Sequence, residues 1–133
     1  KQAGHGHIVN IVSTAGLIAS AKSSLYSATK FAGIGFSNAL RLELMPYNVY
    51  VTTVNPGPIK TAFFDKADPD GSYVKAVDKY ILEADVVAKQ IVDNFGKKKR
   101  ELTMPFALKA AHKLYTLLPN IGDKLASKMF NYK

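Results

Sequence analysis

The sequence predicts an α/β fold in which helices flank a parallel sheet. Stretches rich in β-branched residues alternate with stretches of helical periodicity, in the order 7–13, 24–45, 49–55, 84–95, 100–104 and 106–118. A helix between successive strands is the connection that parallel strands require. Hydrophobic residues make up 47% of the 133 residues, which is enough for one domain with its own core.

The first strand and the first helix follow from the residue pattern. Residues 7–13, HIVNIVS, are mostly apolar and β-branched, as in a strand that is buried on both faces. Residues 14–23 are mostly small and polar, and they predict a loop. The helix then extends over 24–45, because Pro46 would break the hydrogen bonds of a longer helix.

The second strand, 49–55, leads straight into Pro56-Gly57-Pro58, which forces a turn. Residues 60–82 have mixed character. The next helix, 84–95, shows apolar residues at helical spacing, and a short third strand is expected at 100–104.

The last part of the chain, 105–133, predicts a helical extension. A helix over 106–118 ends at Pro119, and a short last helix reaches about Phe130. The segment 106–130 is basic and amphipathic, so it is suited to an anionic membrane surface. It is equally suited to packing on the protein's own cleft or on a second subunit, and we favour packing on the protein itself.

Composition excludes several classes of protein. The absence of cysteine excludes disulfides and thiolate metal sites. His5 and His7 have no third ligand nearby in the sequence, and the remaining histidine is His112, so we expect no metal site. No apolar run approaches the roughly 20 residues of a membrane-spanning helix. We expect a cytoplasmic protein, with peripheral membrane association through 106–130 left open.

The net charge of +8 attracts nucleic acid, anionic lipid or an anionic cofactor through its long-range field. The densest basic cluster, 97–100, follows a predicted helix, where positive charge suits the negative end of the helix dipole. A solvent-exposed turn at the end of this helix is enough to explain the basic cluster. Aromatic residues do not interleave with these lysines, so we expect no nucleic-acid partner.

The stretch SLYSATK, residues 24–30, places Tyr26 and Lys30 four positions apart, on one face of the predicted helix. A cation within about 4–6 Å of a phenol stabilises its ionised form, which allows general acid–base catalysis. Taken alone, this spacing is better explained as a surface pair. Ser13 and the loop at Pro56 favour a catalytic pair instead, because they stand at the ends of two strands, at the edge where parallel sheets bind ligands.

Four segments together resemble the short-chain dehydrogenase/reductase family: IVNIVSTAG at 8–16, YSATK at 26–30, FSNALRLEL at 36–44 and VNPGPIKT at 54–61. Both the residue types and the separations agree, over residues 4–104. The resemblance implies a partial Rossmann-like, doubly wound parallel sheet, of which this chain is the C-terminal half, with three strands and flanking helices.

The resemblance also implies roles for single residues. Tyr26 would exchange a proton with the substrate's carbonyl or hydroxyl oxygen, Lys30 would assist it and hold the nicotinamide ribose, and Ser13 would hold the substrate oxygen. Cofactor contacts are implied for Tyr26 as well as Lys30. The residues implied to line the nicotinamide and part of the phosphate bridge are Pro56, Gly57, Ile59 and Thr61. A mobile substrate lid is implied over 62–82, where an apolar substrate would touch Phe63, Phe64 and Tyr73.

The implied function is hydride transfer between NAD(P)(H) and a carbonyl or alcohol substrate. The family's glycine-rich turn and catalytic asparagine lie upstream of its serine, and this sequence holds neither. We therefore expect residues 1–133 to be the C-terminal portion of one NAD(P)-binding domain and to be inactive without the missing N-terminal half. We also expect a homo-oligomer formed through 24–45. Between NADP and NAD we favour NADP, although the residues that distinguish them belong to the missing half.

Two other classes of function remain open. The first is a non-catalytic binding scaffold with this fold, against which the intact Ser13, Tyr26 and Lys30 argue. The second is a basic protein that binds nucleic acid or a lipid surface, for which binding should weaken steeply with salt.

Overall fold

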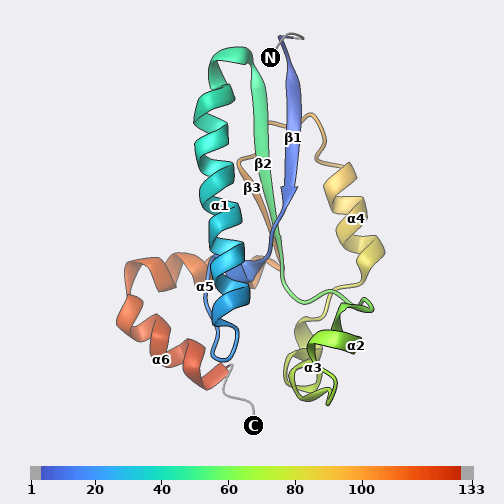
Figure 1. The fold of residues 1–133 in the computed structure, drawn as a ribbon, viewed down its shortest axis with the longest axis vertical. Coiled ribbons are helices and arrows are strands. Elements are labelled where there is room, and N and C mark those ends of the chain that lie inside the picture. Colours follow the sequence, from blue (N-terminus) through green and yellow to red (C-terminus); the bar gives the residue numbers. More distant parts are fainter. Residues whose placement is uncertain (1–3, 130–133) are drawn as a thin grey trace.

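A parallel three-stranded sheet forms the centre of the structure (Figure 1). The computed structural model describes residues 4–129. Its strands lie in the order β1 (Gly6–Ile11), β2 (Val49–Pro56) and β3 (Glu101–Met104), and both pairings are parallel. This arrangement confirms the predicted α/β fold. The carboxyl ends of the three strands therefore meet at one side of the sheet, the carboxyl edge.

β1 ends earlier than predicted. Val12 still donates its backbone N–H to β2 at 2.8 Å, but Ser13 begins the 3-10 turn η1 (Thr14–Gly16). The Ser13 hydroxyl accepts the N–H of Ala15 at 3.1 Å, and such local bonds compete with strand pairing. The prediction of burial on both faces was also wrong, because β1 is an edge strand and Ile11 is 63% exposed.

α1 (Ser24–Leu44) covers one face of the sheet and matches the predicted helix within one residue. It ends in the 3-10 turn η2 (Met45–Tyr47), where Pro46 removes a backbone donor. The outer face of α1 exposes large apolar side chains, namely Leu25, Phe31, Phe36 and Leu42. A surface helix normally turns its apolar stripe toward a core, so this face marks a surface suited to a further partner.

Polar bonds fasten the inner face of α1 to the sheet. Ser37 is fully buried; its hydroxyl accepts from Asn10 Nδ2 at 2.9 Å and donates to the Gly33 carbonyl at 2.7 Å. Arg41 Nε donates to the Val51 carbonyl of β2 at 2.9 Å. Burial is the main cause that lowers the pKa of Arg41 below its usual value. These bonds satisfy the buried polar groups of Ser37 and Arg41, as a stable helix–sheet contact requires, whereas the Asn55 Oδ1 atom of β2 is buried without a hydrogen-bond partner among the described residues.

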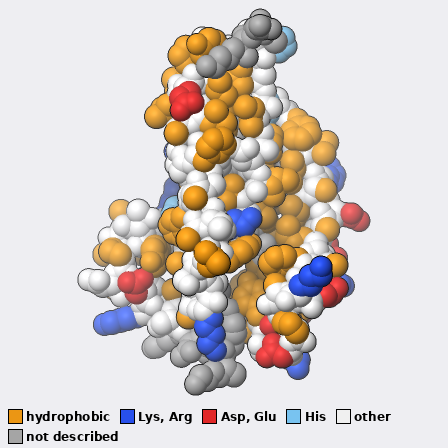
Figure 2. All heavy atoms as spheres, in the orientation of Figure 1, with side chains coloured by type: hydrophobic (Ala, Val, Ile, Leu, Met, Phe, Trp, Pro, Cys, Tyr) orange, Lys and Arg blue, Asp and Glu red, His pale blue; other side chains and the backbone are white. Residues whose placement is uncertain are grey.

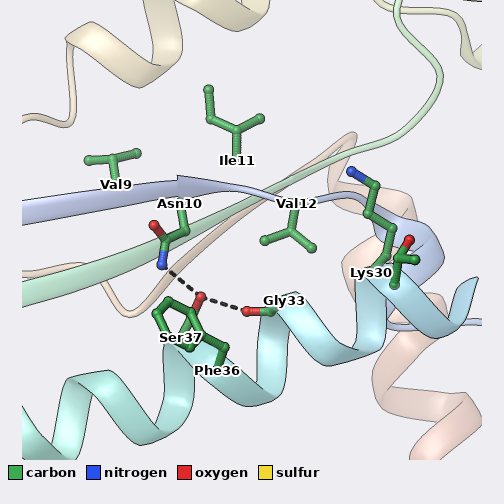
Figure 3. A pocket seen from close by; sticks show the side chains of 9 residues that line it. Val9, Asn10, Ile11, Val12, Lys30, Gly33, Phe36 and Ser37 are labelled. Carbon is green, nitrogen blue, oxygen red and sulfur yellow. Dashed lines mark hydrogen bonds between the residues drawn. The ribbon is translucent and has the colours of Figure 1, made fainter. Parts of the chain in front are cut away.

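α4 (Ala84–Val92) covers the opposite face of the sheet. Side chains of β1 alternate accordingly: Asn10 and Val12 point toward α1, whereas Val9 and Ile11 point away from it (Figure 3). The core on the α4 side consists of Val54, Val87 and Met104, with Val9, Ile59, Leu82, Ile91 and Leu102 packed against them. In Figure 2, hydrophobic side chains gather over the upper part of α1 and between β1 and α4. Helices on both faces agree with a doubly wound sheet.

The segment between β2 and α4 is helical in part, which the sequence pattern did not resolve. It contains α2 (Phe63–Ala67), α3 (Ser72–Val77) and the 3-10 turn η3 (Asp78–Tyr80). A parallel bridge between Ile59 and Leu82 closes the segment at its base. The segment is therefore an excursion that leaves from the carboxyl edge and returns to it (Figure 1).

The C-terminal helices α5 (Phe106–Leu117) and α6 (Pro119–Met129) form a hairpin beside the sheet (Figure 1). Pro119 not only ends α5 but also begins α6, where its missing N–H is harmless. Phe130, the expected end of the last helix, lies outside the described residues. Within residues 4–129, no helix has the length and the apolar character to cross a bilayer.

The contact between η1 and α1 gives a test of the fold. A Cβ on Gly16 would stand 2.6 Å from the Lys30 carbonyl oxygen, whereas a Cβ on Gly35 would meet nothing within 4 Å. We expect Gly16→Ala to lower the free energy of unfolding by about 1–3 kcal/mol through overpacking. Gly35→Ala, the matched control, should raise it by about 0.5–1 kcal/mol because alanine favours the helix interior. Urea denaturation measures both, and equal stability of Gly16→Ala and the wild type would contradict the close contact.

Candidate active site

The end of β1 and the end of β2 come together at the carboxyl edge. Ser13 stands two residues after β1 and is the N-cap of η1. Its hydroxyl lies 3.5 Å from the Pro56 carbonyl, the last residue of β2, which is a long and therefore weak hydrogen bond. Adjacent parallel strands thus deliver the predicted serine and the predicted proline loop to one place, as the sequence analysis expected.

Gly16 brings this edge against α1. With no Cβ, it lets η1 approach the backbone of Lys30 and the side chain of Ile34. A Cβ at this position would be closer to the Lys30 carbonyl than any normal contact. The absence of a side chain at Gly16 therefore sets how near the Ser13 segment can come to the turn of α1 that carries Tyr26 and Lys30.

Tyr26 and Lys30 meet on one face of α1. The Lys30 ammonium lies 5.3 Å from the centroid of the Tyr26 ring, within the range of a cation–π contact. Tyr26 is 39% exposed, so its phenol is open to solvent and to a ligand. Figure 3 shows the Lys30 side chain extending from α1 toward the chain that follows β1. Among residues 4–129, no carboxylate forms a salt bridge with Lys30.

A row of aromatic rings continues from Tyr26 into the segment after β2. Ring centroids are 6.1 Å apart for Tyr26 and Phe63, 5.4 Å for Phe63 and Phe64, and 5.5 Å for Phe64 and Tyr73. The three aromatic residues that the resemblance placed in a lid therefore stand in line with Tyr26. The row gives the site an apolar wall, and ring pairs of this kind contribute about 0.5–1.5 kcal/mol each.

The end of β3 and the helix α5 hold the loop after β2 in place. Gly57 donates its backbone N–H to the Met104 carbonyl at 2.7 Å. Leu108 of α5 fits over Gly57, with its Cδ1 atom 3.1 Å from where a Cβ would stand. Further along, the Thr61 hydroxyl donates to the Ile59 carbonyl at 3.4 Å. Of the loop residues implied to line a nicotinamide, Pro56 and Gly57 are buried and Thr61 is exposed.

Neither of two clefts on the described surface is lined by all three of Ser13, Tyr26 and Lys30. A cleft of about 320 Å³ between β1 and α1 is lined by Lys30, Gly33 and Phe36, among others, but by neither Ser13 nor Tyr26 (Figure 3). A second cleft, of about 440 Å³, contains Thr61 and Phe64. β1 is an edge strand, and within residues 4–129 no strand pairs with its outer side, so the site is open there.

Sequence reasoning missed Thr14. Its hydroxyl donates to the Pro56 carbonyl at 3.3 Å, the same oxygen that the Ser13 hydroxyl approaches. The sequence does contain a signal, since Ser13 and Thr14 are adjacent hydroxyl residues at a strand end. What it could not show is that both point at one carbonyl of the neighbouring strand.

His7 has a structural role near the amino ends of β1 and β2. His7 Nε2 lies 2.8 Å from the Thr52 hydroxyl, and His7 Nδ1 accepts the backbone N–H of Gly96 at 3.0 Å. In the part of the chain that the structure describes, no group of three histidine, cysteine, aspartate or glutamate residues is placed to hold a metal ion.

Comparison with known proteins identifies the family. A family model described as short chain dehydrogenase matches residues 1–71, more than half of the chain. The chain belongs to the short-chain dehydrogenase family. Membership confirms the resemblance that the four segments carried, and the matched range includes Ser13, Tyr26, Lys30 and the loop at Pro56.

Individual short-chain dehydrogenases match a larger part of the chain. It is 35% identical to the putative oxidoreductase SadH of Mycobacterium tuberculosis, over 93% of this chain and 48% of that protein. It is 32% identical to the 3-ketodihydrosphingosine reductase of Bacteroides thetaiotaomicron, over 68% and 35%. A solved short-chain dehydrogenase from Sphingobium yanoikuyae, in complex with NADPH, is 27% identical with a TM-score of 0.69, over 95% and 46%. The chain spans half or less of the length of these relatives.

The Asp68 carboxylate holds the start of α3, and this contact can be tested. The Asp68 carboxylate accepts the backbone N–H groups of Tyr73 at 3.1 Å and Val74 at 2.9 Å. We expect Asp68→Ala to speed amide exchange at Tyr73 and Val74 by about tenfold, since loss of a helix cap costs about 0.5–2 kcal/mol. Asp65→Ala, an exposed carboxylate on α2, is the control. Unchanged exchange at both amides, measured by NMR, would show that Asp68 does not hold α3.

Proposed function

We propose that this chain carries the catalytic residues of an NAD(P)-dependent oxidoreductase that interconverts a carbonyl and an alcohol. The supporting observation is the placement of the Tyr26–Lys30 pair on α1 beside the loops that follow β1 and β2. Family membership supports the same reaction type, and the putative oxidoreductase SadH is one of the relatives.

Tyr26 is the general acid of the reduction. Its O–H bond breaks and the proton moves to the substrate's carbonyl oxygen, while a C–H bond forms at the carbonyl carbon. Lys30 stabilises the phenolate that remains, because its ammonium lies on the same face of α1. In the oxidation direction the phenolate removes the alcohol proton. The bound nicotinamide supplies or accepts the hydride.

Ser13 holds the substrate oxygen by donating its hydroxyl hydrogen. In the structure this hydroxyl accepts the Ala15 N–H and donates across a long 3.5 Å contact to the Pro56 carbonyl, and Thr14 donates to the same carbonyl at 3.3 Å. When Ser13 turns to the substrate, Thr14 keeps that carbonyl hydrogen-bonded. The change of partner therefore leaves no buried acceptor unpaired, which would otherwise cost about 1–3 kcal/mol.

The residues at the carboxyl edge fit the nicotinamide end of the cofactor. Pro56, Gly57 and Ile59 offer apolar surface and backbone groups for the ring, Thr61 offers a hydroxyl, and Lys30 offers donors to the ribose hydroxyls. The cofactor is NADP or NAD, and the NADPH complex of the Sphingobium relative supports the first. The adenosine end of the cofactor would be held by the N-terminal half of the domain, which lies outside residues 1–133.

The substrate we propose is a ketone or alcohol on an apolar molecule. The row of Phe63, Phe64 and Tyr73 gives the site an apolar wall next to Tyr26. One relative is named for a 3-keto substrate, 3-ketodihydrosphingosine. The lid segment is anchored at Asp68 and Asp70; hydrogen bonds from Ser72 hold the pKa of the Asp70 carboxyl below its usual value.

Replacement of the phenol tests the proposal in the longer protein that contains this chain. Tyr26→Phe removes the proton donor, so we expect kcat to fall by about 10²–10⁴ with a carbonyl panel and NADPH or NADH. Binding of the cofactor, followed by fluorescence, should persist. Tyr50→Phe is the matched control, because Tyr50 lies near the opposite end of β2. The 133-residue chain alone should show no turnover. Full activity of Tyr26→Phe would refute the role of Tyr26 as proton donor, and a wild-type protein without turnover, whose binding function survives Tyr26→Phe, would favour the scaffold alternative.

We also propose that the isolated chain self-associates through α1 and the open edge of β1. An unpaired edge strand and exposed apolar side chains both promote association. Sedimentation velocity over a concentration series should show oligomers, weakened about tenfold or more by Leu25→Ser with Phe36→Ser. Phe106→Ser with Leu117→Ser, on α5, should leave association unchanged. A monomer at every concentration would refute the proposal.

A further inference from the structure

α5 turns its apolar face outward. Phe106, Ala110, Leu114 and Leu117 recur at intervals of four, four and three residues, which places them on one side of the helix. All four are exposed, and Phe106 and Leu117 are 78% and 77% exposed. These four residues are the α5 face. A surface helix normally buries such a stripe, so the α5 face requires a partner that the described residues do not supply.

Contacts on the other side of α5 hold this orientation. Leu108 packs over Gly57, and the Lys109 ammonium lies 3.8 Å from the Glu101 carboxylate of β3. α6 packs on α5 where Gly122 meets the Tyr115 ring. The Tyr115 hydroxyl donates to Asp123 at 2.9 Å, and this bond raises the pKa of Tyr115. The helix is therefore anchored through Leu108, Lys109 and Tyr115, and it cannot turn the α5 face inward without breaking these contacts.

The charge of the hairpin is one-sided. From 105 to 133 the sequence contains a single acidic residue, Asp123, against the basic residues Lys109, Lys113, Lys124, Lys128 and Lys133. α5 itself has no acidic residue. Lys113 is exposed and lies one turn from Leu117, at the border of the α5 face. An apolar stripe bordered by lysines is complementary to a surface that is apolar inside and anionic outside.

The α5 face is separate from the surface that completes the domain. β1 is the edge strand next to the open cleft, whereas α5 follows β3 at the other edge of the sheet. A segment that pairs with β1 would therefore add to the sheet on the side away from α5.

We propose that the α5 face docks this protein on an anionic lipid bilayer. Phe106, Leu114 and Leu117 insert among the acyl chains near the headgroups, while Lys113 and Lys124 contact the lipid phosphates. α5 begins at the carboxyl edge, with Leu108 against Gly57 of the loop after β2. Docking brings the carboxyl edge next to the membrane, so an apolar substrate can pass from the bilayer to the site without crossing water.

A single tryptophan tests the docking directly, because the chain contains none. We expect Leu117→Trp to shift its emission to shorter wavelength, and to be shielded from an aqueous quencher, on addition of phosphatidylcholine–phosphatidylglycerol vesicles. Pure phosphatidylcholine should give a smaller shift. Val92→Trp, a similarly exposed position on α4, is the matched control and should not respond. No response at position 117, or an equal response at position 92, would overturn the proposal.

Charge reversal separates docking from a general attraction of a basic protein. Lys113→Glu with Lys124→Glu should lower partitioning to the anionic vesicles by more than about tenfold, since each lysine near such a surface contributes about fivefold. Lys97→Glu with Lys98→Glu changes the net charge equally, in the loop before β3. It should retain most of the binding. Equal losses in the two variants would contradict docking through the hairpin.

The vesicle-free sample distinguishes a second copy of the chain from a membrane. If the α5 face were an interface between copies, Leu117→Trp would already be blue-shifted and shielded without lipid, increasingly so at higher protein concentration. That result would overturn the proposal. Shielding that appears only with lipid supports it. Circular dichroism of every variant checks that the fold is intact.

Discussion

The parallel pairing of β1 with β2 is the constraint on which the site depends. Because the two strands run in the same direction with Gly6 opposite Val49 and Ile11 opposite Val54, the chain leaves both at one edge. The Val12 N–H continues the ladder one residue beyond β1. This continuation delivers the Ser13 hydroxyl to the carbonyl of Pro56. A shift of register by one residue would exchange the faces of the sheet and carry Ser13 away from α1.

Gly16 lets the carboxyl edge lie close to the turn of α1 that carries Tyr26 and Lys30, and so forms the candidate site. The hydroxyl segment after β1 and the Tyr26–Lys30 turn belong to different elements, and only a residue without Cβ lets η1 lie against the Lys30 backbone. The same logic holds below the loop, where Gly57 receives Leu108. Two close approaches, rather than a network of salt bridges, set the distances between the predicted site residues. Their free-energy contribution comes from packing, which tolerates little change in volume.

The sequence predicted those features that local pattern controls. α1, the three strands and the last two helices follow from periodicity, β-branched runs and the prolines at 46 and 119. The pair Tyr26 and Lys30 follows from helical spacing. Other features depend on individual side-chain hydrogen bonds that periodicity does not show: the local bond at Ser13 that ends β1, the carboxylate of Asp68 that starts α3, and Thr14 at the Pro56 carbonyl of a distant strand. The outward turn of α5 belongs here too, because amphipathicity shows that a helix has an apolar face but not what covers it.

Solvent exposure decides how well the proposed chemistry works. The attraction between the Lys30 ammonium and a phenolate on Tyr26 weakens in proportion to the local dielectric constant. With Tyr26 39% exposed and the cleft at β1 open, water weakens the attraction on which the proton transfer depends. Any element that covers the site, whether the aromatic row at Phe63, a segment paired with β1 or a bilayer beside α5, strengthens that attraction without touching either residue. The proposed catalytic pair is thus formed within one helix, but the strength of its interaction is set by what surrounds it.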